Sequence, residues 1–171
     1  MVGRMRVAVT LLGSLLLIVP AHGASQAATE ARTIRVVSVT VGSKVMVDKA
    51  PRGILSAGDT VWAKSSLRNE RPQFGKPRGA RVGSEVAIYT FESLAIGTVR
   101  VTTTFPGGTI RSSDRRAYEG CCATQSQVTG GTGVFAGARG TLRSEHLTGG
   151  QIVNLTLTQG RRLNIYRLQL P

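Results

Sequence analysis

The chain has very few of the side chains that build metal sites and hydrolytic centres. Only two histidines occur among its 171 residues, and no Cys-x-x-Cys or His-x-x-x-His spacing is present. The two cysteines, Cys121 and Cys122, are adjacent and therefore cannot link distant segments. They leave three states open: a vicinal disulfide, a bridge to another chain, or free thiols. These absences argue against a metal site and give no support to a Ser-His-Asp triad.

Acidic residues are also scarce, since nine Asp and Glu stand against 22 Lys and Arg, for a net charge of +13. Scattered acids disfavour a hydrolytic carboxylate pair. A basic protein favours anionic partners such as nucleic acid, acidic polysaccharide or anionic lipid. The densest basic patch has a single aromatic neighbour, Phe74, which disfavours specific binding of single-stranded nucleic acid and favours a solvated loop with weak affinity for anionic surfaces. This patch consists of Arg68, Arg71, Lys76, Arg78 and Arg81.

The N-terminal segment is typical of a secretory signal peptide rather than of a folded element. Two cations, Arg4 and Arg6, precede an apolar run over residues 7–19, and small residues follow at positions suited to cleavage. We therefore expect residues 1–23 to be a signal peptide, residues 24–32 a disordered leader, and residues 33–171 one secreted domain. The alternative is an uncleaved anchor helix. Loss of the two cations leaves +11 on the mature chain.

Period-two alternation of apolar and polar residues runs through the remaining sequence, and no segment shows a helical period. The pattern predicts an all-β domain of eight or nine short strands, which must form a sandwich or close into a barrel to protect their edges. The expected strands cover residues 34–41, 60–68, 82–93, 97–105, 109–116, 126–129, 140–147, 152–158 and 162–170.

A glycine-rich stretch, Val128–Gly140, interrupts this pattern. Such density indicates positive φ angles or close approach of another backbone segment. A phosphate-binding loop is one alternative, but the Gly-Lys-Ser/Thr signature and the following helix are both missing. An ordinary tight turn and a barrel corner are the others.

Taken in order, several motifs resemble those of dirigent proteins and allene oxide cyclases, especially bacterial secreted members. The motifs are Gly58-Asp59-Thr60-Val61-Trp62, Val82-Gly83-Ser84-Glu85, Phe105-Pro106-Gly107-Gly108-Thr109-Ile110, the stretch Val128–Gly140, and the ending Tyr166-Arg167-Leu168. The stretch with its Ala-Arg-Gly end is the most specific. The resemblance covers residues 33–170 and makes the glycine stretch a barrel corner.

This resemblance implies an eight-stranded antiparallel β-barrel, in a family whose members are often trimeric, with an apolar lumen that holds a small hydrophobic molecule. It implies an isomerase-like or dirigent-like function that guides cyclisation or stereoselective coupling by proximity and orientation, with no cofactor. Whether the barrel is catalytic is left open. The alternative is a non-catalytic basic barrel of the cell envelope that binds anionic polymer or lipid.

Five residues are candidates for the site. Glu85 and Tyr89 share one strand face and are the candidate catalytic pair, since a carboxyl group and a phenol can orient or protonate an oxygenated ligand. Trp62, Asn69 and Arg111 are candidate ligand contacts; Asn69 stands where the related proteins commonly carry an acid. The alternatives are a solvated edge for Glu85, core packing for Tyr89, a subunit contact for Trp62 and an exterior charge for Arg111.

Overall fold

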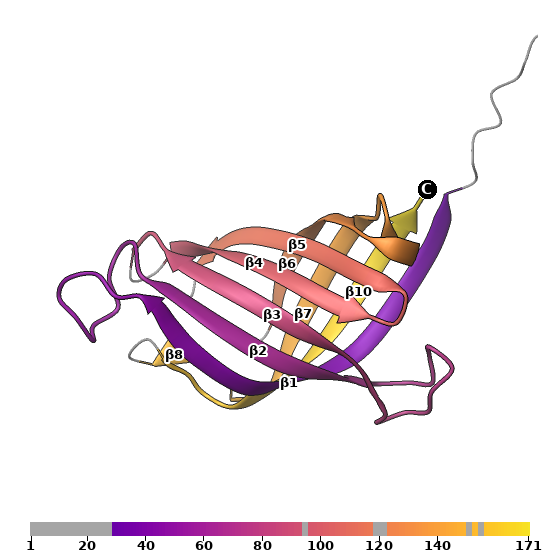
Figure 1. Cartoon of the computed structure of the whole chain (residues 1–171), viewed down its shortest axis with the longest axis horizontal. Coiled ribbons are helices and arrows are strands. Elements are labelled where there is room, and N and C mark those ends of the chain that lie inside the picture. Colours follow the sequence, from indigo (N-terminus) through magenta and orange to yellow (C-terminus); the bar gives the residue numbers. More distant parts are fainter. Residues whose placement is uncertain (1–28, 94–95, 118–122, 150–151, 154–155) are drawn as a thin grey trace, which may run out of the picture.

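The computed structural model is a closed antiparallel barrel of eight strands in the order β1-β10-β7-β6-β5-β4-β3-β2 (Figure 1). It describes residues 29–93, 96–117, 123–149, 152–153 and 156–171. The barrel strands are β1 Glu30–Val47, β2 Thr60–Asn69, β3 Arg81–Phe91, β4 Ile96–Phe105, β5 Gly108–Ala117, β6 Ala123–Gly131, β7 Arg139–Gly149 and β10 Gly160–Leu170. Within the described residues no helix is long and apolar enough to cross a membrane.

The strands agree with the predicted pattern in most places and differ from it at two. The expected strand over 152–158 is instead the separate pair β8, Ile152–Val153, and β9, Thr156–Leu157. β1 is longer than expected because it pairs with β10 from Glu30 onward. Glu30, Ala31 and Arg32 are therefore in a paired strand, although the sequence predicted a disordered leader to residue 32. The predicted signal peptide and the Cys121-Cys122 pair lie outside the described residues.

Two apolar clusters lie in the barrel interior. The larger one includes Phe105, Phe135 and Tyr166, which pack at the end where β1 begins and β10 ends. The smaller one lies toward the other end on β2, β3 and β4 and includes Tyr89 and Phe91, with Leu55 packed against it. Strand alternation produces both clusters, because every second residue of each strand faces the interior.

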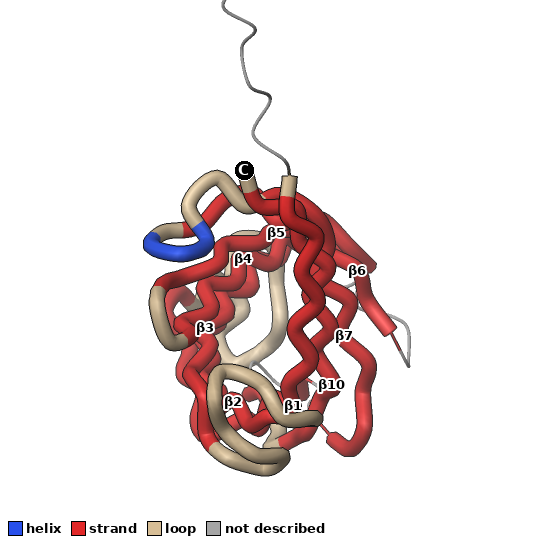
Figure 2. The backbone as a smooth tube through the Cα atoms, turned by 90° about the vertical axis from the view of Figure 1, so that its right-hand side faces the viewer, coloured by secondary structure: helices blue, strands red, loops and turns tan. Residues whose placement is uncertain are grey.

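The glycine stretch forms the connection between the adjacent strands β6 and β7. Between them lies a single turn of 3-10 helix, η1, Gly133–Phe135, drawn in blue in Figure 2. Phe135 and Ala138 are fully buried, so the connection returns an aromatic side chain to the core. The stretch is thus a barrel corner, as the resemblance implied.

Two long loops extend from opposite ends of the barrel (Figure 1). The loop over residues 48–59 joins β1 to β2, and the loop over residues 70–80, which carries part of the basic patch, joins β2 to β3. Asp59 stabilises the first loop: its carboxylate accepts hydrogen bonds from the backbone N–H groups of Lys49 and Ser56, each at 2.6 Å. These bonds, that from Lys49 above all, lower the pKa of Asp59.

Candidate functional site

A set of polar side chains is buried inside the barrel. Interior positions of a small barrel are usually apolar, so a buried carboxyl group there requires an explanation. The central residue is Glu85 on β3, whose side chain is only 7% exposed. The other buried polar residues of the interior, among those the structure describes, are Ser38, Thr40, Ser65, Thr103, Ser112, Ser126 and Asn164.

Glu85 accepts hydrogen bonds from three side chains. Its Oε2 atom accepts one from Asn164 Nδ2 at 2.8 Å and one from the Tyr166 hydroxyl at 3.2 Å, both on β10. Its Oε1 atom is 3.5 Å from Ser38 Oγ on β1. Strands β3 and β10 are not neighbours in the sheet, so these bonds cross the interior.

The Tyr166 hydroxyl has a second partner, Thr103 Oγ1 on β4, at 2.8 Å. A phenol carries a single proton, so when Tyr166 donates to Glu85 the Thr103 hydroxyl is the donor of the second bond. The Tyr166 ring packs edge-on against Phe105 with ring centroids 5.5 Å apart. Packing and hydrogen bonding together fix the orientation of the phenol.

Burial shifts the pKa values of both acids upward. Desolvation raises the pKa of Glu85, and the nearby Arg162 and the three hydrogen bonds only partly offset this effect. Desolvation, together with the neighbouring Glu85, raises the pKa of Tyr166 well above 10. The phenol is therefore a neutral hydrogen-bond donor, and the carboxyl group keeps its proton to a higher pH than an exposed glutamate does.

Arg162 on β10 joins the second interior aromatic to this network. Its Nη1 atom donates to the Tyr89 hydroxyl on β3 at 3.1 Å. Burial opposes the positive charge, but Tyr89 and Glu85 outweigh it, so the pKa of the guanidinium is raised. Arg162 stays charged between the phenol of Tyr89 and the carboxyl group of Glu85.

The structure places the predicted pair, Glu85 and Tyr89, together in the interior. They lie on the same face of β3 with Ala87 and Phe91, all buried. Tyr89 belongs to the smaller apolar cluster and its hydroxyl contacts Arg162. The expected alternative of a solvated strand edge for Glu85 does not hold.

Trp62 lies on the outer face of β2, so the prediction of a lumen contact is wrong. Its neighbours Val61 and Ala63 are the residues that face the core. The Trp62 ring is half-buried on the outside, with Lys44 Nζ 5.7 Å from its centroid. Because successive side chains point to opposite faces of a strand, only one row of β2 can face inward, and that row is the apolar one.

Asn69 is buried, but its polar atoms are hydrogen-bonded to the loop that follows it. Its Nδ2 atom donates to the backbone carbonyl groups of Gln73, Lys76 and Pro77 at 2.8, 3.0 and 3.3 Å. Its Oδ1 atom accepts from Gln73 Nε2 at 3.3 Å. The structure therefore gives Asn69 a role in holding the 70–80 loop rather than the predicted ligand contact.

Arg111 is exposed on the outer face of β5, away from Glu85. The interior residues that the sequence analysis missed are Ser38, Thr103, Arg162, Asn164 and Tyr166. One signal could have found the last three: alternation in β10 places them on one face with Leu168 and Leu170, so polar residues continue an apolar row. Their contact with Glu85 depends on barrel closure.

The interior side chains can donate hydrogen bonds, protonate an oxygen atom and orient a polar group. One acceptor is unused: Asn164 Oδ1 is buried and has no hydrogen-bond partner. Among the described residues no group of three or more His, Cys, Asp or Glu is placed to hold a metal ion.

The fold is similar to the folds of a dirigent protein and of cycloaddition cyclases, which agrees with the resemblance in sequence. A pterocarpan synthase dirigent protein has a TM-score of 0.63 at 15% identity, over 83% of this chain and 97% of that one. The exo-specific intermolecular Diels-Alderase AbnU has a TM-score of 0.59 at 10% identity, over 84% and 99%. A pyocyanin demethylase has a TM-score of 0.58 at 17% identity, over 80% and 99%. No protein-family model matches the sequence, and neither does any curated protein.

Proposed function

We propose that the barrel binds a small hydrophobic molecule in its interior and guides its cyclisation or stereoselective coupling. The observation that carries this proposal is the buried network of Glu85, Asn164 and Tyr166 in the barrel interior. Burying a carboxyl group costs free energy, so a function is the simplest reason to keep one there. The proteins of similar fold include one named a pterocarpan synthase dirigent protein and one named an intermolecular Diels-Alderase, which supports the proposal by analogy.

In this proposal Glu85 is the acid. Its Oε2 atom accepts two hydrogen bonds and its Oε1 atom only the longer one from Ser38, at 3.5 Å, so the proton of the neutral carboxyl group is placed on Oε1. From there it can be donated to a carbonyl or ether oxygen of the ligand, which stabilises the negative charge that develops on that oxygen. Asn164 Oδ1, which lacks a partner, accepts a hydrogen bond from a ligand hydroxyl. The apolar residues around Tyr89 hold the carbon skeleton in one reactive conformer.

The test uses a small hydroxylated aromatic probe, 2-naphthol, whose binding is followed by its fluorescence. We expect Glu85→Gln and Asn164→Leu each to weaken binding about tenfold, the effect of losing one hydrogen bond to a buried polar group. The matched control is Trp62→Phe, since this aromatic side chain lies on the outer face. Equal affinity in all four proteins, or a loss in the control alone, would refute binding at the interior network.

Because the sequence predicts a signal peptide, we also propose that the protein is exported from the cytoplasm. Export is tested by expressing the full chain in a bacterial host and sequencing the N-terminus of the mature protein. An intact N-terminus with Arg4 and Arg6 retained would refute it.

A second candidate function is binding of an anionic polymer or lipid surface through the loop over residues 70–80. One observation favours it: hydrogen bonds of Asn69 and Gln73 stabilise the loop while its cations remain exposed. We expect retention on a heparin column to fall with salt and to fall further when Arg71, Lys76, Arg78 and Arg81 are changed to Gln. Retention that four Gln substitutions leave unchanged would exclude this loop as the binding surface.

A further inference from the structure

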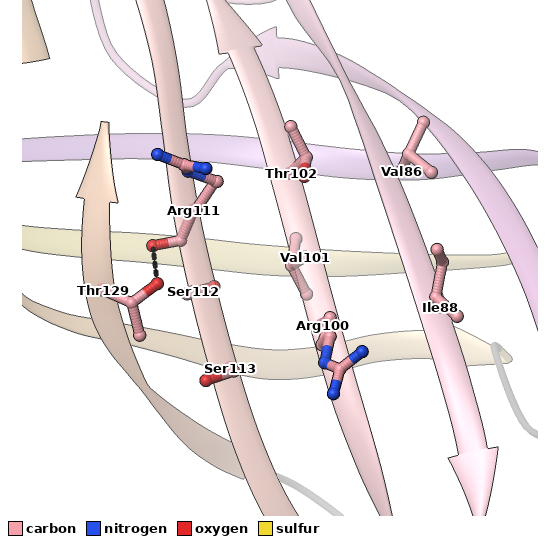
Figure 3. A pocket seen from close by; sticks show the side chains of 9 residues that line it. All are labelled: Val86, Ile88, Arg100, Val101, Thr102, Arg111, Ser112, Ser113 and Thr129. Carbon is pink, nitrogen blue, oxygen red and sulfur yellow. Dashed lines mark hydrogen bonds between the residues drawn. The ribbon is translucent and has the colours of Figure 1, made fainter. Parts of the chain in front are cut away.

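A groove of about 340 Å³ lies on the outer face of the barrel, over strands β3 to β6. Figure 3 shows its side chains: Val86 and Ile88 on β3 at one side, Arg111 and Thr129 at the other, and Arg100 and Thr102 on the strand between them. The backbone of Val101 and Ser112 completes the floor, since their side chains are buried on the interior face. The groove is separate from Glu85, which faces the interior of the same strands.

Cross-strand pairing brings the groove residues into two rows. Val86 pairs with Thr102, and Thr102 pairs with Arg111. Ile88 pairs with Arg100, and Arg100 pairs with Ser113. Each row therefore begins with a half-buried apolar side chain on β3 and leads to an exposed guanidinium. The site thus has an apolar side and a cationic side.

The outer face of this wall carries an excess of positive charge. Glu92, which follows β3, is paired with Arg115 on β5 at 2.8 Å. The only acids in β2 to β6 are Glu85, which is buried, and Asp114, which follows Ile110 and Ser112 on the interior-facing row. Lys64, Arg100 and Arg111 lie on the outer face, and neither groove guanidinium makes an ion pair or hydrogen bond with any described residue. The charge complement of such a surface is an anion.

We propose that this groove binds an amphipathic carboxylate, with the hydrocarbon chain along Val86 and Ile88 and the carboxylate group bound by Arg100 and Arg111. The guanidinium groups of these two residues extend in opposite directions in Figure 3 and turn toward the carboxylate when it binds. Guanidinium groups match carboxylates in geometry and form charge-assisted hydrogen bonds. The hydroxyl groups of Thr102 and Ser113 lie in the same rows and supply further donors. No aromatic side chain lines the groove, which disfavours nucleic-acid bases, and the apolar side disfavours a fully hydrated anion.

The experiment titrates octanoate into the purified protein by calorimetry, with octan-1-ol and acetate as probes of the chain and of the charge alone. We expect octanoate to bind more tightly than either. Arg100→Gln/Arg111→Gln should weaken octanoate binding at least tenfold, since two charged hydrogen-bond donors are lost. The matched control, Arg161→Gln/Arg167→Gln, removes two exposed cations from β10 and should change the affinity less than twofold.

Further variants test the apolar side and separate the possible sources of the ligand. Ile88→Ser should weaken the binding of octanoate but not the binding of acetate. If the double variant does not fold, Arg111→Lys keeps the charge without the planar donor pair and should still weaken binding several-fold. Equal losses in the β10 control, or binding to phosphatidylglycerol vesicles without binding to octanoate, would overturn the proposal in favour of general attraction to anionic surfaces.

Discussion

Replacing Gly133 with alanine is expected to destabilise the barrel by about 3 kcal/mol or more and to lower the midpoint of thermal unfolding by about 10 °C. Two effects add. Gly133 has a φ of +60°, a conformation that costs an alanine about 1 kcal/mol or more. An added Cβ would also lie 2.0 Å from the backbone oxygen of Gly107. The β4–β5 hairpin would have to move, and the hydrogen bond from Val134 N to that oxygen, 3.0 Å long, would be lost.

A matched substitution separates the two effects. Gly79 has a φ of +80°, but nothing lies within 4 Å of the position that a Cβ would take. Gly79→Ala should therefore cost only the conformational part, about 1 kcal/mol. Urea unfolding of both variants gives the comparison. Equal losses would mean that the close contact with Gly107 is unimportant, and the corner would no longer explain the glycine at 133.

The stability of the protein is expected to fall as the pH rises above 4.5, and Glu85→Gln is expected to remove this part of the fall. Burial raises the pKa of Glu85 from 4.5 in the folded state. Below pH 4.5 both states hold the proton, so the shift has no effect. Above it the unfolded chain releases the proton while the folded chain keeps it, so stability falls by up to about 1.4 kcal/mol per pH unit until the folded pKa is reached.

Unfolding free energies of both proteins, measured by urea from pH 4 to pH 9, provide the test. The difference between Glu85→Gln and the natural protein should grow with pH and then level off. Ser38→Ala should move the levelling point to higher pH, because the Ser38 hydrogen bond lowers the pKa of Glu85. Parallel profiles for the natural protein and Glu85→Gln would show that Glu85 titrates alike in the folded and unfolded states, and it would then not keep its proton to a higher pH than an exposed glutamate does.

Local chemistry explains why much of the fold was predictable. Alternation located most strands, and the Pro106-Gly107 turn located the β4–β5 hairpin. The same alternation placed Glu85 and Tyr89 on one strand face. It could not decide which face of a strand turns inward where both rows contain apolar residues, as they do around Trp62. That choice depends on the other seven strands.

The sequence by itself determined the strand pattern and the shared face of Glu85 and Tyr89, because each depends on residues close together in the chain. Only the tertiary structure decided the partners of Glu85, since Asn164 and Tyr166 follow it by 79 and 81 residues. Closure of the barrel also turned Trp62 and Arg111 outward. The amide of Asn69 is hydrogen-bonded to the loop that follows it in the chain. A side chain's direction follows from its strand, but its contacts follow from which strands lie opposite across the interior.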